Sequence, residues 1–211
     1  MSLIYHARVF DNRRALQRGS LHLGFELGGK RIAYAYIRKN GSSAFKRALG
    51  YPTGTDIREI EPSHRWEPRR RYDATIFVWR DPEERLKSLY RNKILEREDA
   101  EDIIVRYRKR MGEEPGSFER FAEFATTNVD PHCVPQRDHL KAILYSHAIP
   151  LGRLHETMAG IVGIEAAQAF TRPVNASNEV AIDVSDRARA LIRHHYASDY
   201  EMIAAITRGG I

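Results

Sequence analysis

Two segments of this chain follow the same order: an apolar strand, a short turn, and a helix that starts at once. Residues 31–37 read RIAYAYI, and a helix is expected from about Ser43 to Leu49. Residues 74–79 read ATIFVW, whose β-branched and aromatic side chains predict a buried strand. Asp81 then supplies an N-cap and Pro82 the first helical residue. Strands that alternate with helices predict an α/β domain with a mainly parallel sheet.

The remaining pattern is mostly helical. Phe118, Phe121, Ala122 and Ala125 recur at the spacing of one helix face. Helices are expected over 81–96, 100–111, 137–146, 156–170 and 185–206, a short strand over 151–154, and a long irregular connection over 50–73, which is rich in Pro, Gly, Arg and Asp. At 211 residues the chain predicts a single domain, 1–211, with room for a small helical appendage.

The amino-acid composition limits where the protein is expected to act and which classes of partner it is expected to bind. The longest apolar runs are too short to span a bilayer, and Arg8, Asp11, Arg13 and Arg14 interrupt any signal-peptide core. The single cysteine, Cys133, excludes an internal disulfide, so we expect a reducing, cytoplasmic location. The net charge of +6 favours an anionic partner, for which nucleic acid, a phosphorylated cofactor and an acidic glycan all qualify. A basic surface without a specific role is the alternative.

The turn after the first strand, KNGSSAFK, has the composition of an anion-binding loop. Gly41 lets an anion approach the backbone, Ser42 and Ser43 add hydroxyl donors, and Lys39 and Lys46 add charge. An ordinary turn with a serine cap has the same residues. The nucleotide motif G-x-x-x-x-G-K-[ST] is absent. Because Lys39 precedes the glycine, it enters from the strand side, which indicates a phosphorylated donor other than ATP or GTP.

The second strand leads into RDPEERLKSLYRNK, residues 80–93. An arginine at the C-terminal edge of a strand, here Arg80, can direct two N–H groups at one phosphate, and Ser88 follows on the helix. Arg85 and Lys93 either add positive charge or are solvated structural residues. The alternative for Arg80 is a surface salt bridge, for which acidic partners stand nearby at Asp81, Glu83 and Glu84.

These two elements together resemble the sulfotransferases that use 3′-phosphoadenosine 5′-phosphosulfate (PAPS), and most of all the carbohydrate sulfotransferase branch (family 2) that includes the chondroitin 4-O enzymes. That branch has a Lys-x-Gly-Cys/Ser-Ser/Thr loop, here KNGSS, and a strand ending in R-D-P-x-x-R-L-x-S-x-Y-x-x-K, matched in full by 80–93. Weaker similarities follow in the same order: SFERFAEFA, DPHCVPQ, GRLHETMAGIVGIEA, VNAS and HHYASDYEMI. The chain departs from the branch at Arg38, where proline is usual, and at Cys133, where tryptophan is usual.

The resemblance implies a P-loop-NTPase-like, three-layer α/β/α fold and a compact, bacterial-type enzyme. Such an enzyme would move a sulfuryl group from PAPS to a hydroxyl or amine, with a carbohydrate as the expected acceptor and without a metal. Lys39 would be the catalytic cation at the departing 5′-phosphate. Residues implied to bind the 5′-phosphosulfate are Lys39, Asn40, Gly41, Ser42, Ser43, Ala44 and Phe45. Arg80 and Ser88 would bind the 3′-phosphate. Asn175 and Ser177 are further candidates to approach the cofactor.

The acceptor needs a general base, and three residues qualify. His64, in the connection between the two phosphate elements, is the first choice because histidine titrates near neutral pH. His132, in a helix-breaking DPHCVP segment, is the second, and Glu61 the third. The run Arg65–Arg71, with aromatic residues among the arginines, either guides an anionic or glycan acceptor or forms a solvated loop.

Two other functions remain as alternatives. A P-loop kinase or NTPase would have a similar order of strands and helices, but its lysine motif is missing. A nucleic-acid-binding module would use the basic runs at 65–71 and 106–110. A metal hydrolase is disfavoured because His132, Cys133, Asp138 and His139 lack standard ligand spacing. Neither the acceptor nor the oligomeric state follows from the pattern.

Overall fold

The computed structural model describes residues 8–171 and 181–208, so Asn175 and Ser177 lie outside the described residues. The chain forms two compact units. The sheet unit comprises Met1–Trp79, Asp138–Ala176 and Ala205–Ile211, and the helical unit comprises Arg80–Arg137 and Ser177–Ala204. The KNGSS loop therefore belongs to the sheet unit, whereas Arg80 and Ser88 belong to the helical unit.

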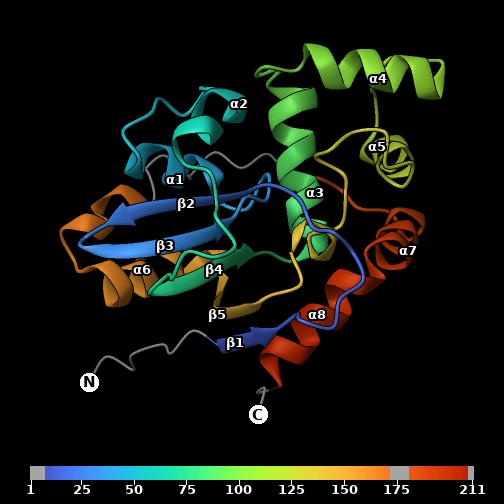
Figure 1. The fold of residues 1–211 in the computed structure, drawn as a ribbon. Coiled ribbons are helices and arrows are strands. Elements are labelled where there is room, and N and C mark those ends of the chain that lie inside the picture. The colour runs from blue at the N-terminus through green and yellow to red at the C-terminus, as the bar shows by residue number, and fades with distance from the viewer. Residues whose placement is uncertain (1–7, 172–180, 209–211) are drawn as a thin grey trace. The chain divides into compact units, whose positions relative to one another are not determined.

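The sheet unit contains one five-stranded sheet over the described residues, with the strand order β1-β5-β4-β3-β2 (Figure 1). Its strands are β1 (Arg8–Asp11), β2 (His22–Leu27), β3 (Lys30–Ala35), β4 (Ala74–Trp79) and β5 (Leu144–Pro150). The central strands β3, β4 and β5 are parallel, whereas β1 and β2 pair antiparallel at the two edges. The fold is thus mixed α/β, and the expectation of a mainly parallel sheet holds only for its centre.

The edge strand β2 forms a hairpin with β3 that was not predicted from the sequence. Gly28 and Gly29 both have positive φ, +56° and +70°, as a two-residue turn between twisted strands requires. Gly28 also has no room for a side chain, because a Cβ there would lie 2.0 Å from the carbonyl oxygen of Val162. The Gly-Gly pair is the local signal that identifies this hairpin.

Aromatic packing holds the first helix against the sheet. Helix α1 (Ser42–Ala48) buries Ala44 and Phe45. Phe45 stacks on Tyr34 of β3 with ring centroids 3.7 Å apart and meets Phe25 and Phe170 edge-on. The same core includes residues of α2 (Ile57–Ile60), of α6 (Leu154–Val162) and of the 3-10 helix Ala166–Phe170. The start of α1, and with it the KNGSS loop, is therefore fixed by buried contacts.

The helical unit is built around a second apolar core. It contains α3 (Pro82–Tyr90), continued by a π turn (Arg91–Leu95), α4 (Glu101–Met111), α5 (Phe118–Ala125), α7 (Asp186–His195) and the first part of α8 (Ala197–Thr207). Asp81 caps α3, as predicted, by accepting a hydrogen bond from the Glu84 N–H at 3.1 Å. Cys133 is buried in this core and is a free thiol.

Several expected elements differ from the structure. The helix expected over 137–146 is wrong: a 3-10 turn (Arg137–His139) precedes β5, which occupies the sheet between β4 and β1. The expected strand 151–154 is instead a 3-10 turn, Leu151–Arg153. The connection 50–73 contains α2 and a 3-10 turn, Glu61–Ser63, and the helix expected over 185–206 is divided at Tyr196. No described helix is both long and apolar enough to cross a membrane.

Candidate functional site

The loop after β3 has an unusual backbone. Lys39 and Gly41 both adopt positive φ, +65° and +78°. Glycine takes this conformation freely, but in a lysine it costs about 1–2 kcal/mol. Such strain persists where the surroundings impose it, and it is frequent in binding and catalytic loops. Lys39, the predicted catalytic lysine, is thus held in a conformation that its own preferences disfavour.

Asn40 ties this loop to the neighbouring strand. Its side chain is fully buried, and its Nδ2 donates to the carbonyl oxygen of Val78 in β4 at 2.8 Å. The loop therefore lies against the C-terminal end of β4 within the sheet unit. The side chain of Asn40 acts inside the protein, so only its backbone remains for the predicted binding of a phosphate.

The residues after Gly41 start α1 without a side-chain cap. Gly41 is the N-cap residue, and its carbonyl accepts from Ala44 N at 2.9 Å. Ser42 shares a hydrogen bond with the Tyr36 hydroxyl, whose pKa is raised, mainly by burial. Ser43 is exposed, whereas Ala44 and Phe45 are buried.

Lys46 has a structural contact. Its ammonium group donates to the carbonyl oxygens of Thr53 and Thr55, at 3.0 and 2.6 Å. It therefore holds the segment that follows α1.

His64 lies in the same unit as Lys39, on a segment beside the edge strand β2. Its carbonyl accepts from Gly24 N at 2.8 Å, and its Nε2 lies 3.5 Å from the Tyr51 hydroxyl. Partial burial lowers the pKa of His64, which favours the neutral imidazole that a general base requires. Glu61, the third base candidate, is engaged by Arg65 at 2.8 Å.

The arginine run after His64 is largely exposed and partly paired. Besides the Arg65 pair, Arg70 lies 3.5 Å from Glu26 and 3.6 Å from Glu67. Trp66 lies under the Lys141 ammonium at 5.3 Å from the ring centroid. These contacts anchor the two ends of the run to the sheet unit and leave Arg69–Arg71 at the surface.

In the helical unit, Arg80 is held through its main chain. Gln136 accepts from Arg80 N at 3.0 Å and donates from Nε2 to the Arg80 carbonyl at 2.8 Å. The Arg80 side chain is 21% exposed, and its guanidinium lies 3.9 Å from the Glu84 carboxylate, a distant ion pair. Ser88 is half-buried on α3.

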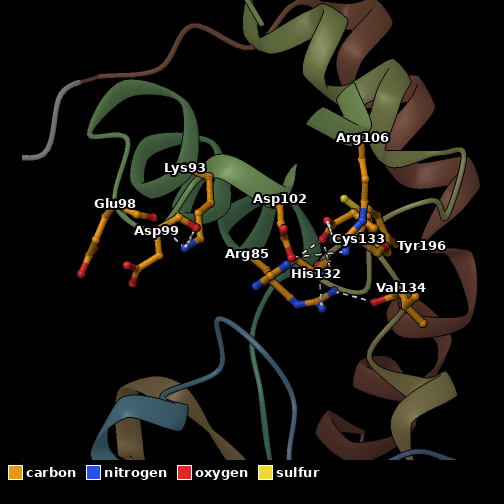
Figure 2. A network of polar contacts seen from close by, with 11 residues as sticks. Arg85, Lys93, Glu98, Asp99, Asp102, Arg106, His132, Cys133, Val134 and Tyr196 are labelled. Carbon is orange, nitrogen blue, oxygen red and sulfur yellow. Dashed lines mark hydrogen bonds and ion pairs between the residues drawn. The ribbon is translucent and has the colours of Figure 1, made fainter. Parts of the chain in front are cut away.

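Two further cations of the same motif, Arg85 and Lys93, hold backbone carbonyls of the helical unit. Arg85 is buried, and its guanidinium donates to the carbonyl oxygens of His132 and Val134, both at 3.0 Å (Figure 2). Lys93 donates to the carbonyls of Glu98 and Asp99 at 2.7 and 2.9 Å. Arg85 is therefore a buried support for residues 132–134, not a solvated one.

His132, the second base candidate, is paired with a buried carboxylate. Asp130 accepts from His132 Nδ1 at 2.6 Å, from His132 N at 2.9 Å and from Arg106 at 2.6 Å. Burial acts to raise the pKa of Asp130, but the hydrogen bonds from His132 and Arg106 prevail and lower it to about 2. Asp130 thus fixes the orientation of a His132 side chain that is 24% exposed.

Asp199 in α8 binds three N–H groups of Gln136 and Arg137, a role that was not predicted from the sequence. Its Oδ2 accepts from Gln136 N at 2.9 Å and Gln136 Nε2 at 3.1 Å, and its Oδ1 accepts from Arg137 N at 2.8 Å. Burial raises the pKa of Asp199 although these N–H groups oppose the shift. The segments DPHCVPQ and HHYASDYEMI contain Gln136 and Asp199, but 63 residues separate the two, and no local pattern links them.

Comparison with known proteins decides the class of this chain. A model of the sulfotransferase family matches residues 28–202. The chain belongs to the sulfotransferase family. No curated protein and no solved structure matches it. The match includes both predicted phosphate elements, so this sulfotransferase has in its sheet unit a strained lysine loop and in its helical unit an arginine fixed through its main chain.

Proposed function

We propose that this sulfotransferase uses PAPS as its donor and transfers the sulfuryl group to a hydroxyl or amine of an acceptor, with a carbohydrate as the preferred class. The observation that carries the proposal is the family match over 28–202, which spans KNGSS and RDPEERLKSLYRNK together. The KNGSS loop does not fit an ATP-binding loop, because its lysine precedes the glycine. The kinase alternative is therefore not favoured.

In the proposed reaction an acceptor oxygen or nitrogen attacks sulfur in line as the bond from sulfur to the 5′-phosphate oxygen breaks. The acceptor proton passes to a general base, and 3′,5′-ADP leaves. Negative charge grows on the bridging oxygen, where Lys39 would stabilise it. Preorganisation makes such a charge effective, and the left-handed backbone of Lys39, next to the buried Asn40 anchor, supports this role.

Donor specificity would depend on the 3′-phosphate, which distinguishes PAPS from ATP. Arg80 would bind that phosphate with two N–H groups, and the Ser88 hydroxyl would add a third donor. The fixed main chain of Arg80 supports this assignment, because Gln136 bonds both its N–H and its carbonyl and so sets the direction in which the side chain leaves the backbone.

For the general base we propose His64, with the His132–Asp130 pair as the alternative. His64 lies in the sheet unit with Lys39, and its lowered pKa keeps it neutral at pH 7. The observation that favours His132 is its 2.6 Å hydrogen bond to a buried carboxylate, the arrangement that orients a catalytic imidazole. Transfer rates of His64→Gln and His132→Gln decide between them.

The proposal is tested by thermal shift with 3′,5′-ADP, Mg-ATP and a short duplex DNA as separate ligands. We expect stabilisation by 3′,5′-ADP that is lost in Arg80→Ala. Arg110→Ala, at an exposed position of α4, is the matched control and keeps the response. Stabilisation by Mg-ATP alone would contradict PAPS as the donor and favour the kinase alternative, and stabilisation by DNA alone would favour the nucleic-acid-binding one.

A further inference from the structure

We propose that Gln136 and Asp199 are positioning residues that orient Arg80 for the donor's 3′-phosphate. The inference rests on the proposed function, in which Arg80 binds that phosphate. All three residues belong to the helical unit, and Gln136 and Asp199 are fully buried. Neither contacts the donor in this proposal; each acts through the next residue.

The Gln136 side chain binds the main chain of Arg80. Arg80 stands between the last residue of β4 and the N-cap of α3. The Gln136 carboxamide imitates a peptide group: its Oε1 accepts from Arg80 N and its Nε2 donates to Arg80 O. Both polar groups of the Arg80 main chain are thereby paired, so the direction of its Cα–Cβ bond is fixed.

Asp199 in turn fixes the orientation of the Gln136 carboxamide. A carboxamide can rotate by half a turn and exchange its oxygen and nitrogen, which would place a donor against Arg80 N. A carboxylate accepts and does not donate, so Asp199 Oδ2 selects the orientation in which Nε2 donates to it and to the Arg80 carbonyl, while Oε1 accepts from Arg80 N. The same carboxylate holds Gln136 N and Arg137 N, which fixes the backbone that carries the carboxamide.

Gln136 and Asp199 should therefore affect binding of the donor's 3′-phosphate and not of the rest of the donor. Arg80 has a long side chain, and its guanidinium meets a 3′-phosphate with two bonds only when the main chain points it correctly. Loss of the clamp should therefore weaken recognition of the 3′-phosphate and leave recognition of the adenosine 5′-phosphate unchanged. A purely structural role would weaken both alike.

The test is calorimetric binding of 3′,5′-ADP and of 5′-AMP to the full chain, because the ratio of their Kd values isolates the 3′-phosphate. We expect the wild type to prefer 3′,5′-ADP by roughly 10- to 100-fold, the range for charge-assisted hydrogen bonds. Arg80→Ala brings the ratio close to one. Gln136→Ala lowers it by about tenfold, and the isosteric Asp199→Asn by severalfold, while the Kd for 5′-AMP changes by less than about twofold.

Tyr196→Phe is the matched control. It removes a buried hydrogen bond of the same unit, from the Tyr196 hydroxyl to the Cys133 carbonyl at 2.8 Å, in which neither Arg80 nor Gln136 takes part, and it should keep the wild-type ratio. A wild-type ratio retained in both Gln136→Ala and Asp199→Asn overturns the positioning role alone. A wild-type ratio near one overturns the proposed function, and the positioning role with it. If Gln136→Ala does not fold, Asp199→Asn decides the matter.

Discussion

The strained backbone of Lys39 predicts that glycine is a more stable residue than alanine at this position, although both remove the proposed catalytic ammonium group. Lys39→Ala removes the ammonium group and keeps the strain of φ +65°, whereas Lys39→Gly removes both. The strain costs about 1–2 kcal/mol in an L-residue, and the extra freedom of glycine in the unfolded chain offsets about 0.5–1 kcal/mol. Lys39→Gly should therefore be more stable than Lys39→Ala by up to about 1.5 kcal/mol, and neither variant should transfer sulfuryl groups efficiently.

The assay is urea unfolding of both variants beside a control pair in the same unit. Gly160 lies in α6 with an ordinary φ and open space around the position of a Cβ. There the order reverses, and Gly160→Ala should be about 1 kcal/mol more stable than the wild type. The reasoning is refuted if alanine is the more stable residue at position 39 as well, because that result would mean that Lys39 is not held in the left-handed region.

Three further predictions follow from individual residues. Burial of His22 lowers its pKa to about 4, so the unfolded chain binds the proton first; stability should fall between pH 6.5 and 4 by on the order of 3 kcal/mol, and His22→Gln should flatten the unfolding curve in that window. Gly41→Ala should destabilise the protein by about 1–2 kcal/mol in urea unfolding, because φ is +78° and its Cβ would lie 2.9 Å from a methyl group of Leu151. If His64 is the base, kcat/KM should show an acid limb below pH 6.5 that disappears in His64→Gln and persists in His132→Gln; the reverse result identifies His132.

Elements whose sequence signals all lie within one short segment were predicted correctly. The ATIFVW strand has the predicted bounds Ala74–Trp79, and Asp81-Pro82 starts α3 as predicted, because side-chain shape and helix capping act within a few residues. The turn at KNGSS was also predictable, since Gly41 and the following serines mark a strand-to-helix turn.

Non-local pairing was not predictable in the same way. The residues of β5 have spacing that also suits a helix, and only pairing with β4 and β1 makes them a strand. The same limit applies to the site: the contacts of Gln136 with Arg80 and Asp199 join residues 56 and 63 positions apart. The left-handed conformation of Lys39 was equally hidden, because lysine gives no signal for positive φ.

PAPS is the proposed sulfuryl donor of this sulfotransferase, and Lys39 is its proposed catalytic cation. The most direct measurement incubates the protein with sulfur-35-labelled PAPS and a mixture of glycans and small hydroxylated acceptors, with phosphorus-32-labelled ATP in a parallel reaction. We expect sulfur label on an acceptor with the wild type and with Lys109→Ala, a variant at an exposed lysine of α4, and at least about 100-fold less label with Lys39→Ala. Phosphorus label on an acceptor without any sulfur label would contradict the proposal.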